Sequence, residues 1–211
     1  MGFEPLNFLT MANRSYIYAL KGDKHISLGE FNYFIPYAYR ILAAYDSKVI
    51  ESHLFDKIVG IEANFKKGKE ALYLLLDVLV ATNEMKDHEE FVAAVQKTKE
   101  FLDPIDADKI LLENGEIYAL YTKDGVYLDG PGMERANEHA REDYEWIGED
   151  ITNLAELVSS HFKHPSHIFK VTDESFLKLY QWILDLKDNW KEESGIDSWR
   201  SILYFQFQSE E

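Results

Sequence analysis

The spacing of apolar residues along the chain predicts strands and helices in alternation. β-Branched and aromatic residues run together where we expect strands, and apolar residues recur every three or four positions where we expect helices. The predicted strands cover residues 14–20, 58–63 and 201–207, and the predicted helices cover residues 36–45, 69–81, 89–102, 133–158 and 175–191. The motif Ser27-Leu-Gly-Glu30 matches a helix capping box, but Pro36 follows too soon for a long helix to start there.

The region from Lys109 to Leu128 carries the clearest turn signals in the sequence. Asn114-Gly115 favours the two positive-φ positions of a type I′ turn, so we predict a hairpin of residues 109–113 and 116–121. Asp124-Gly125 repeats the signal and predicts a short third strand at residues 126–128. The predicted fold class is therefore α+β. It is a single domain whose sheet is mainly antiparallel, contains a central hairpin meander and packs against several helices.

The helix predicted from Met133 to Val158 has two faces of opposite character. Its glutamates recur every three or four residues and would lie along one side. They are Glu134, Glu138, Glu142, Glu145 and Glu149, and the apolar residues of another side are Ala136, Ala140, Ile147, Ile151, Leu154 and Val158. Like charges at i,i+4 destabilise a helix by roughly 0.2–0.5 kcal/mol per pair. Two interpretations follow: a solvated charged face, or a negative surface that binds a basic partner.

The overall charge limits the classes of partner. The chain has 211 residues, with 38 Asp and Glu against 22 Lys and Arg, which gives a formal net charge of −16. Such a surface repels phosphate, so nucleic acid and anionic membrane are disfavoured as direct ligands. A basic protein is favoured because opposite fields accelerate encounter, although solubility alone also accounts for a negative surface.

Compartment and chain start can also be predicted. The sequence has no cysteine, which excludes disulfides, thiolate metal sites and cysteine nucleophiles. The apolar runs are too short to span a bilayer, and the residues after Met1 lack the basic and apolar regions of a signal peptide. We therefore expect a cytoplasmic protein. Met11 is a candidate natural start, with residues 1–10 an N-terminal extension and residues 11–211 the single domain.

Candidate chemistry is sparse. The sequence has no nucleophile elbow, no phosphate-binding glycine-rich loop, no His-Glu-x-x-His and no dinucleotide fingerprint, so we expect no cofactor. The densest histidine cluster is His161, His164 and His167, three imidazoles that would suffice for a zinc or nickel site. The other interpretation is a loop, because Pro165 breaks any helix there. Trp199 and Arg200 are residue types typical of interface anchors, and the alternative places Trp199 in the core with Arg200 paired locally.

Three segments resemble a family of uncharacterised bacterial proteins. They are Met11-Ala-Asn-Arg-Ser-Tyr-Ile-Tyr18, Glu30-Phe-Asn-Tyr-Phe-Ile-Pro36 and Trp199-Arg-Ser-Ile-Leu-Tyr-Phe205. Members of that family open Met-Ala-Asn-Arg-Ser-Tyr-Leu-Tyr and carry Glu-Trp-Asn-Tyr-x-Ile-Pro, where this chain has Phe31 in place of the tryptophan. The resemblance implies a bacterial cytoplasmic origin and a start at Met11. It implies no catalytic residues.

The leading functional hypothesis is a non-enzymatic acidic cytoplasmic binding protein, such as a bacterial immunity or antitoxin-like inhibitor of a basic protein. Its predicted partner-binding residues are Glu134, Glu138, Glu142, Glu145, Glu149, Trp199 and Arg200. The alternative is a metal-assisted hydrolase that uses His161, His164 and His167 with carboxylates between Glu138 and Asp143. The sequence does not decide the oligomeric state.

Overall fold

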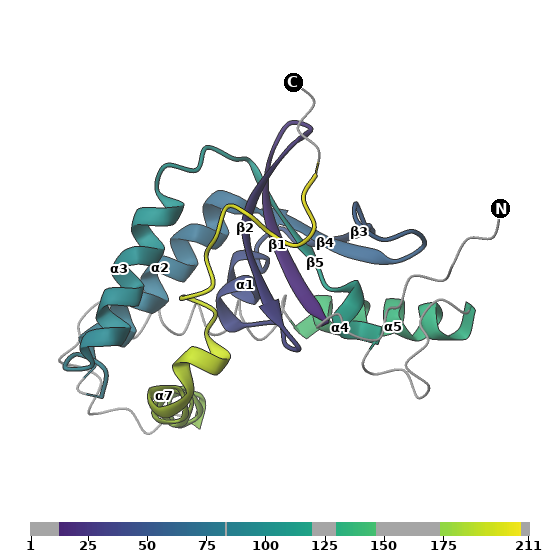
Figure 1. Cartoon of the computed structure of the whole chain (residues 1–211). Coiled ribbons are helices and arrows are strands. Elements are labelled where there is room, and N and C mark those ends of the chain that lie inside the picture. Colours follow the sequence, from purple (N-terminus) through teal and green to yellow (C-terminus); the bar gives the residue numbers. More distant parts are fainter. Residues whose placement is uncertain (1–12, 83, 120–129, 147–173, 208–211) are drawn as a thin grey trace.

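The computed structural model describes residues 13–82, 84–119, 130–146 and 174–207. Within these ranges five strands form one antiparallel sheet in the order β2-β1-β5-β4-β3. The strands are β1 (Arg14–Lys21), β2 (Lys24–Asn32), β3 (Lys48–Glu51), β4 (Val59–Asn64) and β5 (Lys109–Glu113). The helices are α1 (Tyr37–Leu42), α2 (Phe65–Ala81), α3 (Glu89–Leu102), α4 (Gly115–Ala119), α5 (Gly130–Trp146) and α7 (Glu174–Glu193) (Figure 1). The predicted α+β class with a mainly antiparallel sheet is confirmed.

Side chains of the central strands alternate between the two faces of the sheet, as the pleat requires. On β1, Ile17 and Ala19 lie in the main core, which also contains residues of α1, α2, α3 and α7. Tyr16 and Tyr18 point to the other face. Leu203, Phe205 and Phe207 pack on that second face (Figure 1). They belong to residues 199–207, which we call the C-terminal strap.

Helix α2 lies very close to α1 at one point. A Cβ atom built on Gly68 would meet the backbone carbonyl oxygen of Leu42, so only glycine fits this crossing. The helix begins at Phe65, four residues before the predicted start at residue 69, because the Asn64 side chain accepts a hydrogen bond from the Lys67 backbone N–H at 3.1 Å. The predicted bounds of α3, residues 89–102, are confirmed.

The predicted hairpin at Asn114-Gly115 is wrong. Strand β5 forms as expected, but α4 follows it at once, and neither Asn114 nor Gly115 has a positive φ. Asn is also a favoured helix N-cap, and a helical turn buries Ile117 and Tyr118 together in the core. Burial of these two side chains therefore overrides the local turn signal. The third predicted strand, residues 126–128, lies outside the described residues.

The predicted strand at residues 201–207 is wrong as well. These residues alternate as a strand would, with Leu203 buried and Ile202 and Tyr204 largely exposed. Their backbone does not join the sheet. Just before them, Trp199 forms an isolated bridge with Gly29, and the Arg200 N–H donates to the Leu28 carbonyl. The chain crosses the second face of the sheet as an extended segment because its apolar side chains cover Tyr16 and Tyr18.

Two edge strands were not predicted. Residues 27–30, which match a capping box in sequence, lie in the middle of β2, so that motif does not start a helix here. Strand β3 has only four residues, too few for a clear alternation. Helix α7 agrees with the prediction for residues 175–191, and Gly195 adopts a positive φ of 71° shortly after the helix ends.

Candidate functional site

Helix α5 is attached to the sheet by one side. Ala140 is buried, the Asn137 side-chain oxygen accepts a hydrogen bond from the Val59 N–H at 3.0 Å, and the Tyr144 hydroxyl donates to the Ser47 carbonyl at 2.6 Å. These contacts connect the helix to β4 and to the loop before β3. The helix is therefore held in one orientation by residues spaced three and four apart.

The glutamates of α5 lie on a different side of the helix. Glu134, Glu138, Glu142 and Glu145 are all exposed, as the sequence predicts. His139 Nδ1 lies 3.2 Å from Glu142 Oε2. We call these four residues the acidic face of α5. The fifth predicted member, Glu149, lies outside the described residues.

The other predicted anchors, Trp199 and Arg200, lie at the opposite edge of the sheet. Helix α5 packs beside β3 and β4, whereas Trp199 bridges to Gly29 on β2 (Figure 1). The sheet order puts three strands, β1, β5 and β4, between β2 and β3. The predicted partner-binding residues thus form two separate surfaces and not one.

Trp199 contacts the protein's own interior. It is half-buried, its indole N–H donates to the Thr98 hydroxyl at 2.9 Å, and its ring stacks on Phe101 with centroids 6.1 Å apart. Phe101, Trp190 and Trp199 also line an open cavity of about 460 Å³ between α3 and the end of α7. These contacts match the core alternative for Trp199, and a role in partner binding stays a prediction.

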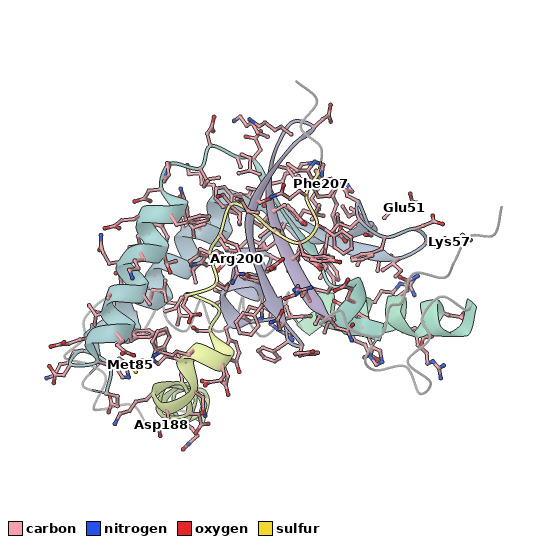
Figure 2. The ribbon with its side chains drawn as sticks, viewed as in Figure 1. Glu51, Lys57, Met85, Asp188, Arg200 and Phe207 are labelled. Carbon is pink, nitrogen blue, oxygen red and sulfur yellow. The ribbon has the colours of Figure 1, made fainter. Side chains whose placement is uncertain are left out.

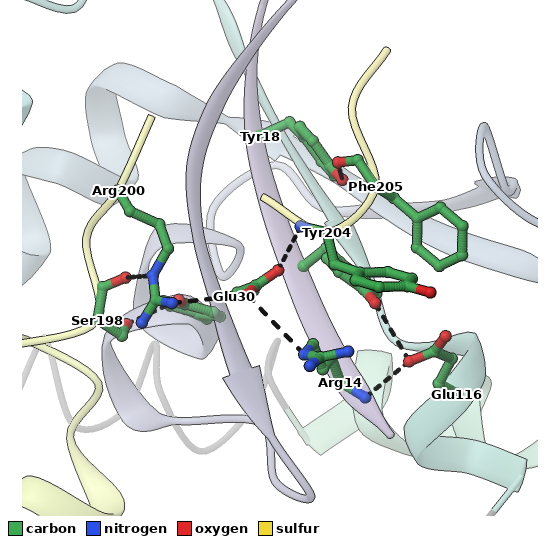
Figure 3. Close-up of polar contacts among 10 residues, drawn as sticks. Arg14, Tyr18, Glu30, Glu116, Ser198, Arg200, Tyr204 and Phe205 are labelled. Carbon is green, nitrogen blue, oxygen red and sulfur yellow. Dashed lines mark hydrogen bonds and ion pairs between the residues drawn. The ribbon is translucent and has the colours of Figure 1, made fainter. Parts of the chain in front are cut away.

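Arg200 belongs to a polar network on the strap side of the sheet (Figure 3). The Glu30 carboxylate lies 3.5 Å from Arg200 Nη1 and 3.8 Å from Arg14 Nε. It also accepts the Tyr204 backbone N–H at 2.8 Å, and the Arg14 guanidinium lies 4.9 Å from the Tyr204 ring centroid. One carboxylate on β2 therefore connects two arginines to the backbone of the strap. Arg200 pairs locally, as the second interpretation of this residue requires.

Glu116 on α4 extends this network through Arg14 and Tyr16. Its Oε2 atom accepts the Arg14 backbone N–H at 2.9 Å and the Tyr16 hydroxyl at 3.2 Å. Burial raises the pKa of the Glu116 carboxyl, and the hydrogen bonds from Arg14 and Tyr16 oppose that shift. The carboxylate thereby connects the start of β1 to α4.

Glu113 is a second buried carboxyl that the sequence analysis missed. It lies on β5, accepts the Ser52 hydroxyl at 2.7 Å and the His53 backbone N–H at 2.6 Å, and has no exposed surface. Burial raises its pKa to about 7. The available signal was a glutamate at the end of the apolar run Ile110-Leu-Leu. Its contacts organise the loop between β3 and β4.

The described part of the structure contains a histidine pair, His25 and His53, that is not the histidine cluster predicted from the sequence. His161, His164 and His167 lie outside the described residues, so the metal alternative stays a prediction. Across the ranges that are described, no group of three or more His, Cys, Asp or Glu side chains is arranged to hold a metal ion. His25 Nε2 and His53 Nδ1 lie 2.8 Å apart at the far end of the strap.

The comparisons identify the class of protein. A protein-family model described as a domain of unknown function (DUF7822) matches residues 16–161, which is more than half of the chain. The chain belongs to this family, and the predicted membership of an uncharacterised family is thereby confirmed. Neither the curated proteins nor the solved structures gave a significant match. Among the helices described, none combines the length and apolar character that a bilayer crossing needs.

Proposed function

We propose that this chain is a cytoplasmic binding protein whose acidic face of α5 binds a basic protein, as an immunity or antitoxin-like inhibitor would. The observation that carries the proposal is the exposure of Glu134, Glu138, Glu142 and Glu145 on a helix whose other side is anchored by Asn137 and Tyr144. A fixed helix presents its charges without an ordering cost at binding.

The net charge supports the same proposal. A formal charge of −16 creates a long-range field that attracts a cationic protein and orients it before contact. The four exposed carboxylates then provide local charge where the partner docks. Rim charges of this kind act mainly on the association rate, which falls as salt screens the field.

The test compares two triple variants of equal net charge. The first is Glu138→Lys, Glu142→Lys and Glu145→Lys on α5. The matched control is Glu70→Lys, Asp188→Lys and Glu192→Lys, at exposed positions of α2 and α7. Wild type and both variants are used to capture partners from the native host. The association rate of the captured basic protein is then measured at low and moderate ionic strength.

We expect the α5 variant to lose capture and the control to keep it, with a slower and less salt-dependent association for the α5 variant. Equal loss in both variants would mean that only the net charge matters. Unchanged binding in both variants would refute the role of α5. Far-UV circular dichroism of each variant checks that the fold is retained.

A further inference from the structure

The end of the C-terminal strap rests on two histidines. Phe207 stacks on the His25 ring with centroids 3.7 Å apart and an interplanar angle of 17°. It also meets Tyr18 edge-on at 4.9 Å and His53 edge-on at 6.4 Å. Figure 2 shows Phe207 toward the far end of the strap and Arg200 where the strap passes β2. The aromatic surface that receives Phe207 is thus built partly from groups that titrate.

The two imidazoles face each other at hydrogen-bond distance. His25 Nε2 and His53 Nδ1 are 2.8 Å apart, so one nitrogen must donate a proton and the other must offer its lone pair. The backbone and the carboxylate of Asp23 favour the protonated form of His25 and so raise its pKa, against the effect of burial. The tautomers of the two rings decide which of them donates in the neutral pair.

Protonation of both rings is incompatible with this contact. Each imidazolium has two N–H donors and no lone pair, so the hydrogen bond is lost and two positive charges face each other. The contact therefore tolerates the neutral pair and the singly protonated pair. A second added proton forces one ring to move away.

We propose that the His25–His53 pair is a pH-sensitive latch, which holds the end of the C-terminal strap near neutral pH and releases it when both imidazoles are protonated. Release would expose the apolar side chains of β1 and β5 that the strap covers, including Tyr18 and Leu111. The latch concerns a different edge of the molecule from the acidic face of α5, so it does not depend on the proposed partner binding.

The neighbouring groups set the direction of the response. Burial and then the charge of His53 lower the pKa of His25, while the Asp23 carbonyl and carboxylate act in the opposite direction. From β5, Glu113 accepts the His53 backbone N–H but not its ring. From β1, Tyr18 faces His25 edge-on at 6.4 Å and donates its hydroxyl to the Phe205 carbonyl. The strap therefore keeps one attachment through Tyr18 that does not titrate with the histidines.

The rest of the strap is held by contacts that do not depend on histidine. Arg200 N–H bonds to the Leu28 carbonyl, and Tyr204 N–H bonds to Glu30. Only Leu203 is buried among residues 201–207. Release at low pH is thus expected to begin at Phe207 and to leave residues 199–204 in place, because their contacts with Leu28 and Glu30 do not involve a histidine.

The experiment uses the absence of cysteine from the whole sequence. Gln206→Cys, at an exposed strap position, gives a unique site for a nitroxide spin label. Label mobility is recorded by electron paramagnetic resonance from about pH 8 to about pH 4.5, a range that extends well below the unperturbed histidine pKa of about 6.5 because the pKa of His25 is lowered. Far-UV circular dichroism at each pH monitors the fold. His53→Phe in the same background removes the second charge, and His139→Gln on α5 is the matched control.

We expect the immobilised fraction of the label to fall severalfold in the wild-type background as pH falls, while circular dichroism is unchanged. His139→Gln should keep this transition, and His53→Phe should abolish it with the label immobilised at both pH values. The latch is wrong if mobility does not change with pH, if His53→Phe keeps the transition, or if the label is released only together with loss of the helical signal.

Discussion

The backbone nitrogen of Tyr204 lies 2.8 Å from the Glu30 carboxylate, although 174 positions separate the two residues. The Glu30 side chain is only 12% exposed and also faces the guanidinium groups of Arg14 and Arg200. The Glu30 carboxylate on the edge strand β2 thereby joins an N-terminal part of the chain to a C-terminal one. It fixes where the C-terminal strap crosses the second face of the sheet.

The first prediction concerns this carboxylate. Glu30→Gln keeps the size of the side chain but removes the charge that two arginines share, and hydrogen bonds to charged groups contribute about 1.5–3 kcal/mol each. We expect the free energy of unfolding to fall by roughly 1–3 kcal/mol, and the amides of residues 203–207 to exchange faster. Urea denaturation and hydrogen exchange measure the two effects. Glu192→Gln, at an exposed position, should leave both unchanged; an equal effect of the two variants would contradict the assigned role of Glu30.

The second prediction concerns the contact of α1 with α2. Gly68→Ala replaces a poor helix former by a good one, which alone would stabilise an exposed helix by about 1 kcal/mol. Here the new methyl group would meet the Leu42 backbone, which cannot move aside as a side chain can. We expect a net destabilisation of about 1–3 kcal/mol, the usual range for overpacking. Thermal and urea denaturation of Gly68→Ala and of Glu70→Ala, on the exposed side of α2, separate packing from propensity. A stabilised Gly68→Ala variant would show that the helices separate without cost.

The local sequence pattern correctly predicted the elements whose structure depends mainly on residues close to one another in the chain. Helix α3 was predicted to the residue because Phe91, Val95 and Leu102 recur with a helical period and end before Pro104. Strand β1 was predicted because Tyr16, Ile17 and Tyr18 are β-branched and aromatic residues of the types enriched in strands. The exposed glutamates of α5 followed from the same argument, since their spacing puts them on one side of a helix.

The errors have a common physical cause, which is competition between local signals and tertiary burial. Asn114 suits a hairpin turn and a helix N-cap equally, and burial of Ile117 and Tyr118 decides between them. Residues 27–30 carry a capping motif but pair with β1 in the sheet. The contacts of Glu30 with Tyr204 and of His25 with His53 join distant segments, so no local pattern in the sequence could indicate them.

The third prediction concerns the pH dependence contributed by Glu113. Its pKa is about 7 in the folded protein and about 4.5 when unperturbed, so the folded state retains a proton that the unfolded state loses. The stabilisation from this proton is complete below about pH 4.5 and is lost as pH rises through about 7. The full difference is up to roughly 3 kcal/mol.

Glu113→Gln isolates this contribution, because the amide carbonyl can still accept the His53 N–H while the group no longer titrates. We expect the free energy of unfolding of wild type to fall, relative to the variant, between about pH 5 and about pH 8. His25 acts in the opposite direction over part of this range, since its lowered pKa costs stability as pH falls, but it is present in both proteins and cancels in the comparison. Parallel pH profiles for the two proteins would show that the carboxyl does not titrate as its burial requires.

The last prediction decides whether the indole of Trp199 serves the core or is available to a partner. The Trp199 N–H donates to the Thr98 hydroxyl at 2.9 Å, and Thr98 also faces the carbonyl groups of Ala94 and Ile196. Trp199→Phe and Thr98→Val each remove one side of the indole–hydroxyl bond. In a double-mutant cycle we expect a coupling of about 0.5–1.5 kcal/mol in the free energy of unfolding, the net contribution of a typical hydrogen bond. Urea denaturation of the wild type, the two single variants and the double variant gives this value.

A parallel cycle of Trp199→Phe with Gln96→Ala, at an exposed position of α3, should give no coupling. Zero coupling in the first cycle would mean that the bond contributes nothing to the fold, and the indole would then regain its place among the candidate partner-binding groups.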